Sequence, residues 1–187
     1  MKKEQLYESI LDKKEELLTL TRQYWSQYAG INTWYFWGNI ATILLPLFIL
    51  YVLIDRKRIF EITFFGYTAH VLWANIDNIL SMNNLIIHPH SLTHMLPVGV
   101  TVTAVLFPVT YMLIYQFCTN YNRNFYLYAV VASIIFAFGF GGLSLLIDLL
   151  RLENGMNLFY LFLIDIIVAF LSLWLTKLFL KIKGTYA

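Results

Sequence analysis

The chain has 187 residues, of which 59% are hydrophobic and 13% charged, with a formal net charge of +2. Because soluble domains carry about 25% charged residues, this composition and the mean hydropathy of +0.65 exclude an ordinary soluble protein. The small net charge gives no reason to expect a nucleic-acid partner. Cys118 is the only cysteine, which excludes an intrachain disulfide.

Residues 1–30 predict an amphipathic helix that stays outside the hydrocarbon. Between residues 3 and 28, apolar and aromatic side chains recur at helical spacing, and Lys and Glu fill much of the other face. With Lys2, this segment carries five basic and five acidic residues, so it cannot span a bilayer. Three placements stay open: on the membrane interface, against a partner helix, or over the chain's own bundle.

Residues 31–187 predict one all-α domain, a transmembrane bundle of five helices. Each of five apolar stretches has roughly the 20 residues that cross about 30 Å of hydrocarbon. Helices satisfy their own backbone hydrogen bonds there, and the stretches lack the alternation typical of a barrel. The predicted spans cover about 34–54, 59–82, 97–117, 125–150 and 156–180.

The distribution of Lys and Arg predicts the orientation. Seven basic residues fall on one side of the five spans, whereas the loops on the other side hold only Arg151. The positive-inside rule therefore places the C-terminus in the cytoplasm and, with five spans, the N-terminal helix outside. We expect the loop residues Arg56, Lys57 and Arg58 to contact anionic lipid of the inner leaflet.

Ionisable side chains inside the spans are informative, because burying them in lipid costs at least a few kcal/mol. His70 lies about twelve residues into the second span, and Asp165 about nine residues into the fifth. At about 1.5 Å per residue, both fall near mid-membrane. We predict that both face the bundle interior, where they can pair. The pair would form a proton, cation or ligand site, or a structural interhelical hydrogen bond.

A second polar cluster is predicted near the outer face. Asn75, Asp77 and Asn78 end the second span, and Asp148 ends the fourth. Asp77 follows His70 by seven residues, so the two share one helix face.

The loop after the second span holds three histidines, His88, His90 and His94. Imidazoles bind Zn²⁺, and Asp77 or Asp148 could complete such a shell. Their spacing matches no fixed structural motif, and solvated histidines at the headgroup level are the simpler interpretation. A metal ion is thus an alternative, and no other cofactor is expected.

Small residues recur every four positions along the fourth span. This pattern lets two helix backbones approach closely, either inside the bundle or at a homodimer interface. The stripe consists of Ala129, Ser133, Ala137 and Gly141.

Several segments resemble one family of membrane proteins. They are LYVLIDRKRIFEITFFG at 50–66, FPVTYMLIYQ at 107–116 and GMNLFYLFLIDIIVAFLSLWLTKLF at 155–179. Together they resemble an uncharacterised family of small five-span membrane proteins from spore-forming Gram-positive bacteria. The resemblance implies a bacterial inner membrane and no particular activity.

Three functions stay open, and the missing motifs favour a protein without catalytic activity. The chain has no Gly-rich phosphate loop, GxSxG, HExxH or paired Cys. The first hypothesis is a non-catalytic partner or assembly protein of the bacterial envelope, bound to lipid and to another membrane protein or itself. The second is a small transporter or substrate-binding bundle that uses His70 and Asp165. The third is a membrane enzyme with a metal site at His88, His90 and His94.

Overall fold

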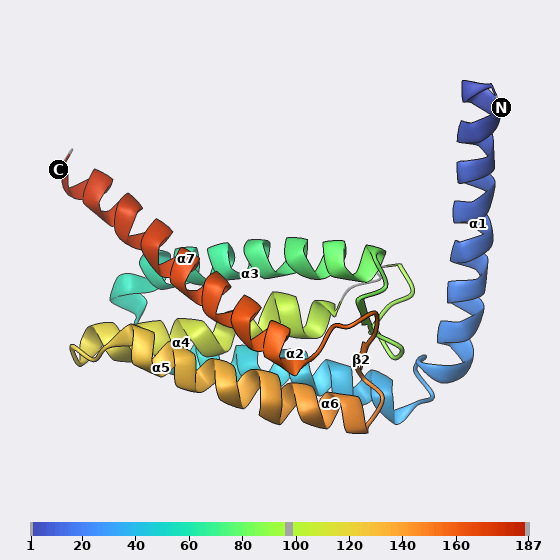
Figure 1. The fold of residues 1–187 in the computed structure, drawn as a ribbon. Helices are drawn as coiled ribbons and strands as arrows, with labels where there is room; N and C mark the ends of the chain where they lie inside the picture. The colour runs from blue at the N-terminus through green and yellow to red at the C-terminus, as the bar shows by residue number, and fades with distance from the viewer. Residues whose placement is uncertain (1, 96–98, 186–187) are drawn as a thin grey trace.

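The computed structural model describes residues 2–95 and 99–185. The chain is an all-α bundle with one further helix, α1, standing away from it (Figure 1). The helices are α1 (Lys3–Tyr28), α2 (Trp34–Leu53), α3 (Ile59–Met82), α4 (Phe107–Asn120), α5 (Phe125–Ile134), α6 (Gly142–Leu146) and α7 (Leu158–Thr185). Polar caps start three of them: Thr33 accepts from the backbone N–H of Phe36, Asn124 from that of Tyr126, and Asn157 from that of Phe159.

Three further helical segments complete the bundle. The short 3-10 helix η1 (Arg56–Arg58) leads into α3, and the π-helix η2 (Thr101–Leu106) continues directly into α4. A second π-helix, η3 (Ile135–Gly141), joins α5 to α6 in one continuous rod. The chain therefore passes along the bundle five times.

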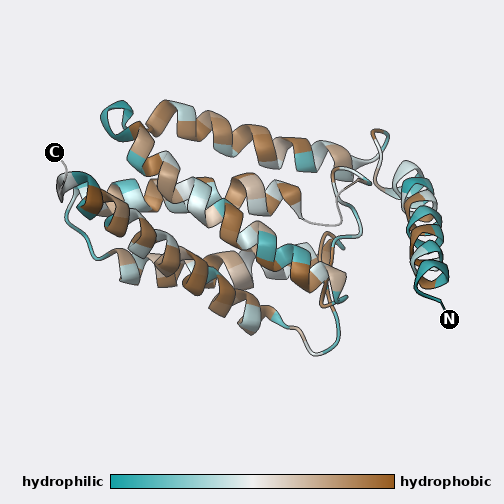
Figure 2. Ribbon diagram, turned by 90° about the horizontal axis from the view of Figure 1, so that it is seen from above, coloured by the Kyte–Doolittle hydropathy of each residue, from teal (hydrophilic) through white to brown (hydrophobic). Residues whose placement is uncertain are grey.

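Four of these passes, among the described residues, are long and apolar enough to cross a membrane: Trp34–Leu53, Thr101–Asn120, Phe125–Leu146 and Leu158–Gly184. The other pass, α3, runs beside them and carries the polar side chains of Glu61, His70 and Asp77. Figure 2 shows the bundle as mostly hydrophobic and α1 as largely hydrophilic. The predicted five-helix membrane bundle is confirmed in its fold.

Three of the predicted spans end at other residues than the observed helices do. The fourth span was expected to reach residue 150, but α6 ends at Leu146 because Asp148 turns the chain with φ 59°. The fifth span extends further than expected, to Gly184, and so does the third span, to Asn120. Its predicted start, residue 97, lies outside the described residues.

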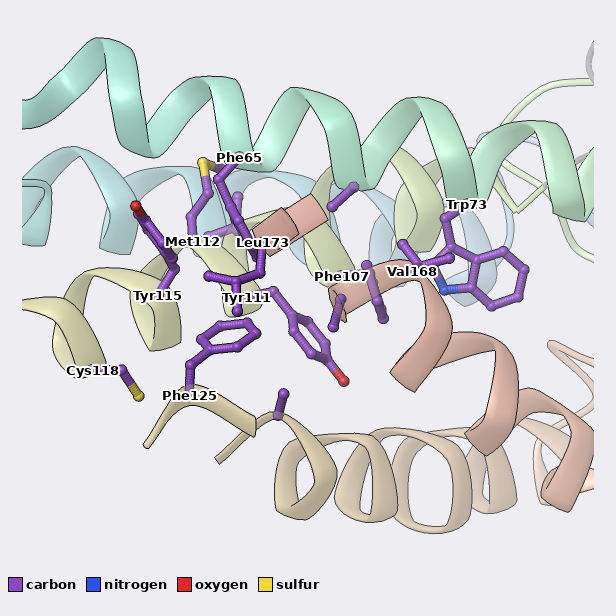
Figure 3. Packing of buried hydrophobic residues seen from close by; sticks show 14 of the residues in the cluster. Phe65, Trp73, Phe107, Tyr111, Met112, Tyr115, Cys118, Phe125, Val168 and Leu173 are labelled. Carbon is purple, nitrogen blue, oxygen red and sulfur yellow. The ribbon is translucent and has the colours of Figure 1, made fainter. Parts of the chain in front are cut away.

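Aromatic rings fill the core between α3, α4 and α5 (Figure 3). Phe65 stacks on Tyr115 with ring centroids 4.7 Å apart, and Phe107 stacks on Tyr111 at 4.2 Å. The buried hydroxyl of Tyr111 lies 2.7 Å from the hydroxyl of Ser133. Since lipid supplies no hydrophobic force between helices, such close packing and buried hydrogen bonds hold the bundle together.

The small-residue stripe on α5 and η3 faces this core. Ala129 and Ser133 have no exposed surface, Ala137 is 2% exposed, and Gly141 is buried. A Cβ atom on Gly141 would lie 3.3 Å from the Leu158 side chain of α7. The stripe therefore serves packing within the chain, the first of its two predicted uses.

We name the two ends of the bundle by their residues. The basic end holds η1, the turn between α4 and α5, and the end of α7. The histidine end holds the start of α2, residues 83–95, the turn after α6, and the start of α7. There β1 (Ile86–Ile87) pairs antiparallel with β2 (Arg151–Leu152), with Ile86 opposite Leu152, and ties the loop after α3 to the loop before α7.

Arg58 connects two helices at the basic end. Its guanidinium binds Glu61 through two nitrogens and donates to Thr119 and Asn120 at 2.9 and 2.6 Å. Arg58 therefore joins α3 to the end of α4, and the lipid contact expected for it stays a prediction. Arg56 and Lys57 are exposed, and their lipid contact stays a prediction.

Candidate functional site

A cavity of about 270 Å³ lies inside the histidine end of the bundle. One ordered water needs roughly 10–15 Å³ of such space, so the cavity has room for a small molecule. Its walls come from α2, α3, β1 and the histidine loop, η2, η3, the turn after α6, and α7. The lining includes Gly38, Asn39, Trp73, Asp77, His88, His90, Thr101, Thr103, Ala137, Leu161 and Asp165.

Both π-helices of the bundle line this cavity. A π-helix bonds each carbonyl to the N–H five residues on, and such segments occur often at functional sites. In η2 the N–H of Phe107 bonds the carbonyl of Val102, and the next donor in this pattern would be Pro108. Pro108 has no N–H, so the carbonyl of Thr103 lacks its π-helical donor. The irregular backbone thus presents a polar group beside the cavity, a place where membrane proteins tolerate one.

That carbonyl explains why the predicted pairing of His70 with Asp165 is wrong. The Nδ1 of His70 lies 3.1 Å from the Thr103 carbonyl oxygen. Asp165 instead accepts a hydrogen bond from Nε1 of Trp73 at 2.9 Å. Asp165 is 1% exposed and lines the cavity, whereas His70 is not among the lining residues.

Asp77 is the second buried carboxylate of the cavity, also 1% exposed. One of its oxygens lies 3.0 Å from Nε2 of His88, and the other accepts from the backbone N–H of Gly99 at 2.9 Å. Gly99 must be a glycine for this arrangement, because a Cβ atom would lie 2.7 Å from Cε1 of His88. The histidine loop and the start of η2 are thereby clamped onto α3.

Asn39 of α2 is a cavity residue that the sequence reasoning missed. Its amide nitrogen donates to the carbonyls of His90 and Tyr35 at 2.8 and 3.0 Å, and its oxygen accepts from Thr101 at 3.0 Å. One side chain therefore connects α2, the histidine loop and η2. A lone amide in an otherwise apolar span was the available signal, because such a group needs partners.

The three loop histidines do not form the predicted metal site. The His88 ring binds Asp77, Nδ1 of His90 lies 3.0 Å from the Tyr28 carbonyl, and the His94 ring packs 5.6 Å from Trp25. Their partners lie on different elements, so the rings do not converge. Within residues 2–95 and 99–185, no group of three or more His, Cys, Asp or Glu is placed to hold a metal ion.

The predicted outer cluster is also divided. Asn75 and Asn78 are exposed on other faces of α3 than the buried Asp77. Asp148 binds Arg151 at 2.7 and 3.0 Å and lies 3.5 Å from Nε2 of His90. The Arg151 guanidinium lowers the pKa of the Asp148 carboxyl below its ordinary value, with a smaller contribution from His90. Asp148 therefore contacts Nε2 of His90 from the turn after α6.

The ionisable side chains of the cavity wall are carboxyl and imidazole groups. Asp77 and Asp165 line it, and no Lys or Arg is among the described residues of its wall. The rings of Trp34 and Trp73 and the apolar Phe136 and Leu161 form much of the remaining surface. A carboxylate beside aromatic faces suits a cation or a hydrogen-bond donor and disfavours an anion.

A scan against protein-family models, a search of curated proteins and a search of solved structures each found no match to this chain. The resemblance of residues 50–66, 107–116 and 155–179 to a five-span family stays a prediction.

Proposed function

We propose that this protein is a bacterial inner-membrane bundle that binds a small, mostly apolar molecule carrying a protonated amine. The observation behind the proposal is the cavity at the histidine end, where two buried carboxylates face space without a lysine or arginine beside them. This is the substrate-binding hypothesis from the sequence with one change in the site. Asp165 stays in the site, and Asp77 takes the place of His70 as its second ionisable residue.

The two carboxylates differ in what they can offer a ligand. Asp77 is held on both oxygens, by His88 and by the N–H of Gly99. Asp165 has one hydrogen bond, from Trp73, which orients it and leaves acceptor capacity. We therefore assign the amine to Asp165 and its apolar body to the surface of Phe136, Phe140 and Leu161.

The proposed orientation puts the cavity toward the outside of the cell. Lys177 and Lys183 of α7 and the η1 residues Arg56–Arg58 lie at the basic end, and this distribution supports a cytoplasmic basic end. The ligand then enters from the histidine end, whose wall consists of loop residues such as His90 and Ser91.

A matched pair of probes tests the proposal: phenylbutylamine and the neutral phenylbutanol, titrated into the purified protein in detergent. We expect the amine to bind saturably and the alcohol about tenfold more weakly, a difference of about 1.4 kcal/mol. Asp165→Asn should weaken the amine about tenfold and leave the alcohol unchanged. The matched control is Asp148→Asn, since this half-exposed carboxylate belongs to the same end but not to the cavity wall.

Equal affinity for the amine and the alcohol in the unmodified protein would refute the proposed ligand class. Unchanged amine binding in Asp165→Asn would remove Asp165 from the site. Thermal unfolding of each variant separates lost binding from lost fold.

A second candidate, a non-catalytic partner protein, is favoured by one observation: every α1 side chain before Thr21 is exposed. The placement of α1 therefore bears on this candidate directly.

A further inference from the structure

The helix α1 lies across the end of the bundle. It runs perpendicular to the long axis of the bundle in Figure 1, and in Figure 2 it again lies beyond the histidine end. Its C-terminal turns attach it there: Nε1 of Trp25 donates to the Ser91 carbonyl at 3.1 Å, and the Tyr28 carbonyl meets Nδ1 of His90. If the bundle spans a bilayer, a helix in this position is parallel to the membrane plane.

One face of α1 is apolar, and it is the face that Trp25 presents to the bundle. Leu18 and Leu11 precede Trp25 by seven and fourteen residues, so all three point in nearly the same direction. Trp25 contacts the histidine end from this face, so Leu18 and Leu11 point toward the membrane plane. The other exposed apolar residues of the stripe are Tyr7, Ile10, Leu17, Tyr24 and Tyr28.

A bilayer fits this stripe better than a second copy of the helix. In a heptad reading of the stripe, Lys14 and Thr21 fall between Leu11 and Leu18 and between Leu18 and Trp25. A lysine and a threonine inside a coiled-coil seam weaken it, whereas a lysine at a lipid surface extends its amine into the headgroups. The exposed rings of Trp34 and Trp37 at the start of α2 mark the headgroup level at the same end.

We infer that α1 is an in-plane helix whose apolar stripe binds the lipid surface at the histidine end. In this placement α1 also contacts the cavity wall, because its hydrogen-bond partners His90 and Ser91 both line the cavity. The inference is independent of the ligand proposal, since it concerns a lipid surface and not the contents of the cavity.

Two neighbouring pairs of positions test it in the full-length protein. In a Cys118→Ser background, single cysteines replace Leu11 or Asp12, and Leu18 or Thr19, and each carries a nitroxide label. Leu11 and Leu18 belong to the stripe, whereas Asp12 and Thr19 lie on the opposite face of the helix. The protein is placed in vesicles of phosphatidylcholine and phosphatidylglycerol. The measurement is the collision rate of each label with oxygen, which prefers lipid, and with a water-soluble nickel chelate.

The expected oxygen-to-nickel ratio is at least about fivefold higher at Leu11 and Leu18 than at their neighbours, as for a helix half-immersed in an interface. Phe48→Cys, on the exposed middle of α2, supplies the lipid reference, and Arg123→Cys, in the exposed turn between α4 and α5, supplies the aqueous one. High nickel accessibility at all four positions would overturn the inference, because α1 would then project into water. Protection from both reagents at Leu11 and Leu18 would also overturn it and would place a protein partner or a second copy on the stripe.

Discussion

The two ends of the bundle use similar polar residues in opposite ways. At the basic end, Glu61 is bound by Arg58 and by the Tyr115 hydroxyl, so a carboxylate, a guanidinium and a phenol satisfy one another. At the histidine end, Asp77 is likewise held on both oxygens, whereas Asp165 has one hydrogen bond, from Trp73, and both residues line a cavity. A buried carboxylate in a membrane helix is therefore a clamp when neighbours occupy it and a candidate site when space adjoins it.

The two ends of the bundle also differ in the type of helix that their backbones form. The helices at the basic end are regular α-helices, whereas η2 and η3 at the histidine end are π-helical. Both π-helices line the cavity, and π-helical turns occur often at functional sites. The cavity therefore lies where the backbone of the bundle is π-helical.

Breaking the clamp at the basic end should produce the largest loss of stability. Arg58→Ala leaves Glu61 without its cation, and hydrogen bonds to charged groups contribute about 1.5–3 kcal/mol each. We expect the free energy of unfolding to fall by about 2–3 kcal/mol, measured by denaturant titration in detergent, with amine binding unchanged in the protein that remains folded.

The control for this clamp is Arg56→Ala, because Arg56 is exposed in the same 3-10 helix and should cost under about 0.5 kcal/mol. Equal losses in the two variants would show that Arg58 contributes through general charge and not through Glu61.

A methyl group at Gly99 should affect the histidine end more through binding than through stability. In Gly99→Ala the new Cβ meets the His88 ring at 2.7 Å, so His88 must move away from Asp77. Overpacking of this kind costs about 1–3 kcal/mol. We expect a loss near 1 kcal/mol, since the ring lies in a loop beside a cavity, together with weaker amine binding in the same titration.

Gly139→Ala is the matched control for Gly99→Ala, because its Cβ would make only an ordinary contact at 3.9 Å with Ile135. Amine binding as strong in Gly99→Ala as in this control would show that His88 does not shape the site.

Long-range features of the fold were predictable from the sequence because the solvent dictates them. Hydrocarbon demands long apolar runs, and these placed the five passes and the separate N-terminal helix. The partners of buried polar groups were not predictable in the same way. His70 binds the Thr103 carbonyl, which lacks its π-helical donor because the residue five positions after Thr103 is Pro108. This contact depends on a π-helix, which hydropathy does not reveal. His88 and His90 share a loop, yet tertiary contacts direct them to different elements.

Pro108 offers the smallest change and the sharpest test of why the two ends differ. In Pro108→Ala the new backbone N–H can supply the π-helical donor that the Thr103 carbonyl lacks, and one such hydrogen bond contributes about 0.5–1.5 kcal/mol. We expect the unfolding free energy to rise by about 0.5–1 kcal/mol and the amine to bind about threefold more weakly, since a tighter η2 moves Thr101 and Thr103 in the cavity wall.

The control is Pro46→Ala in α2, because Pro46 is buried in a helix but does not line the cavity. Higher stability with unchanged binding would mean that the π-helix and the cavity are neighbours without a causal link. Higher stability together with weaker amine binding would mean that the missing backbone hydrogen bond in η2 keeps the cavity open.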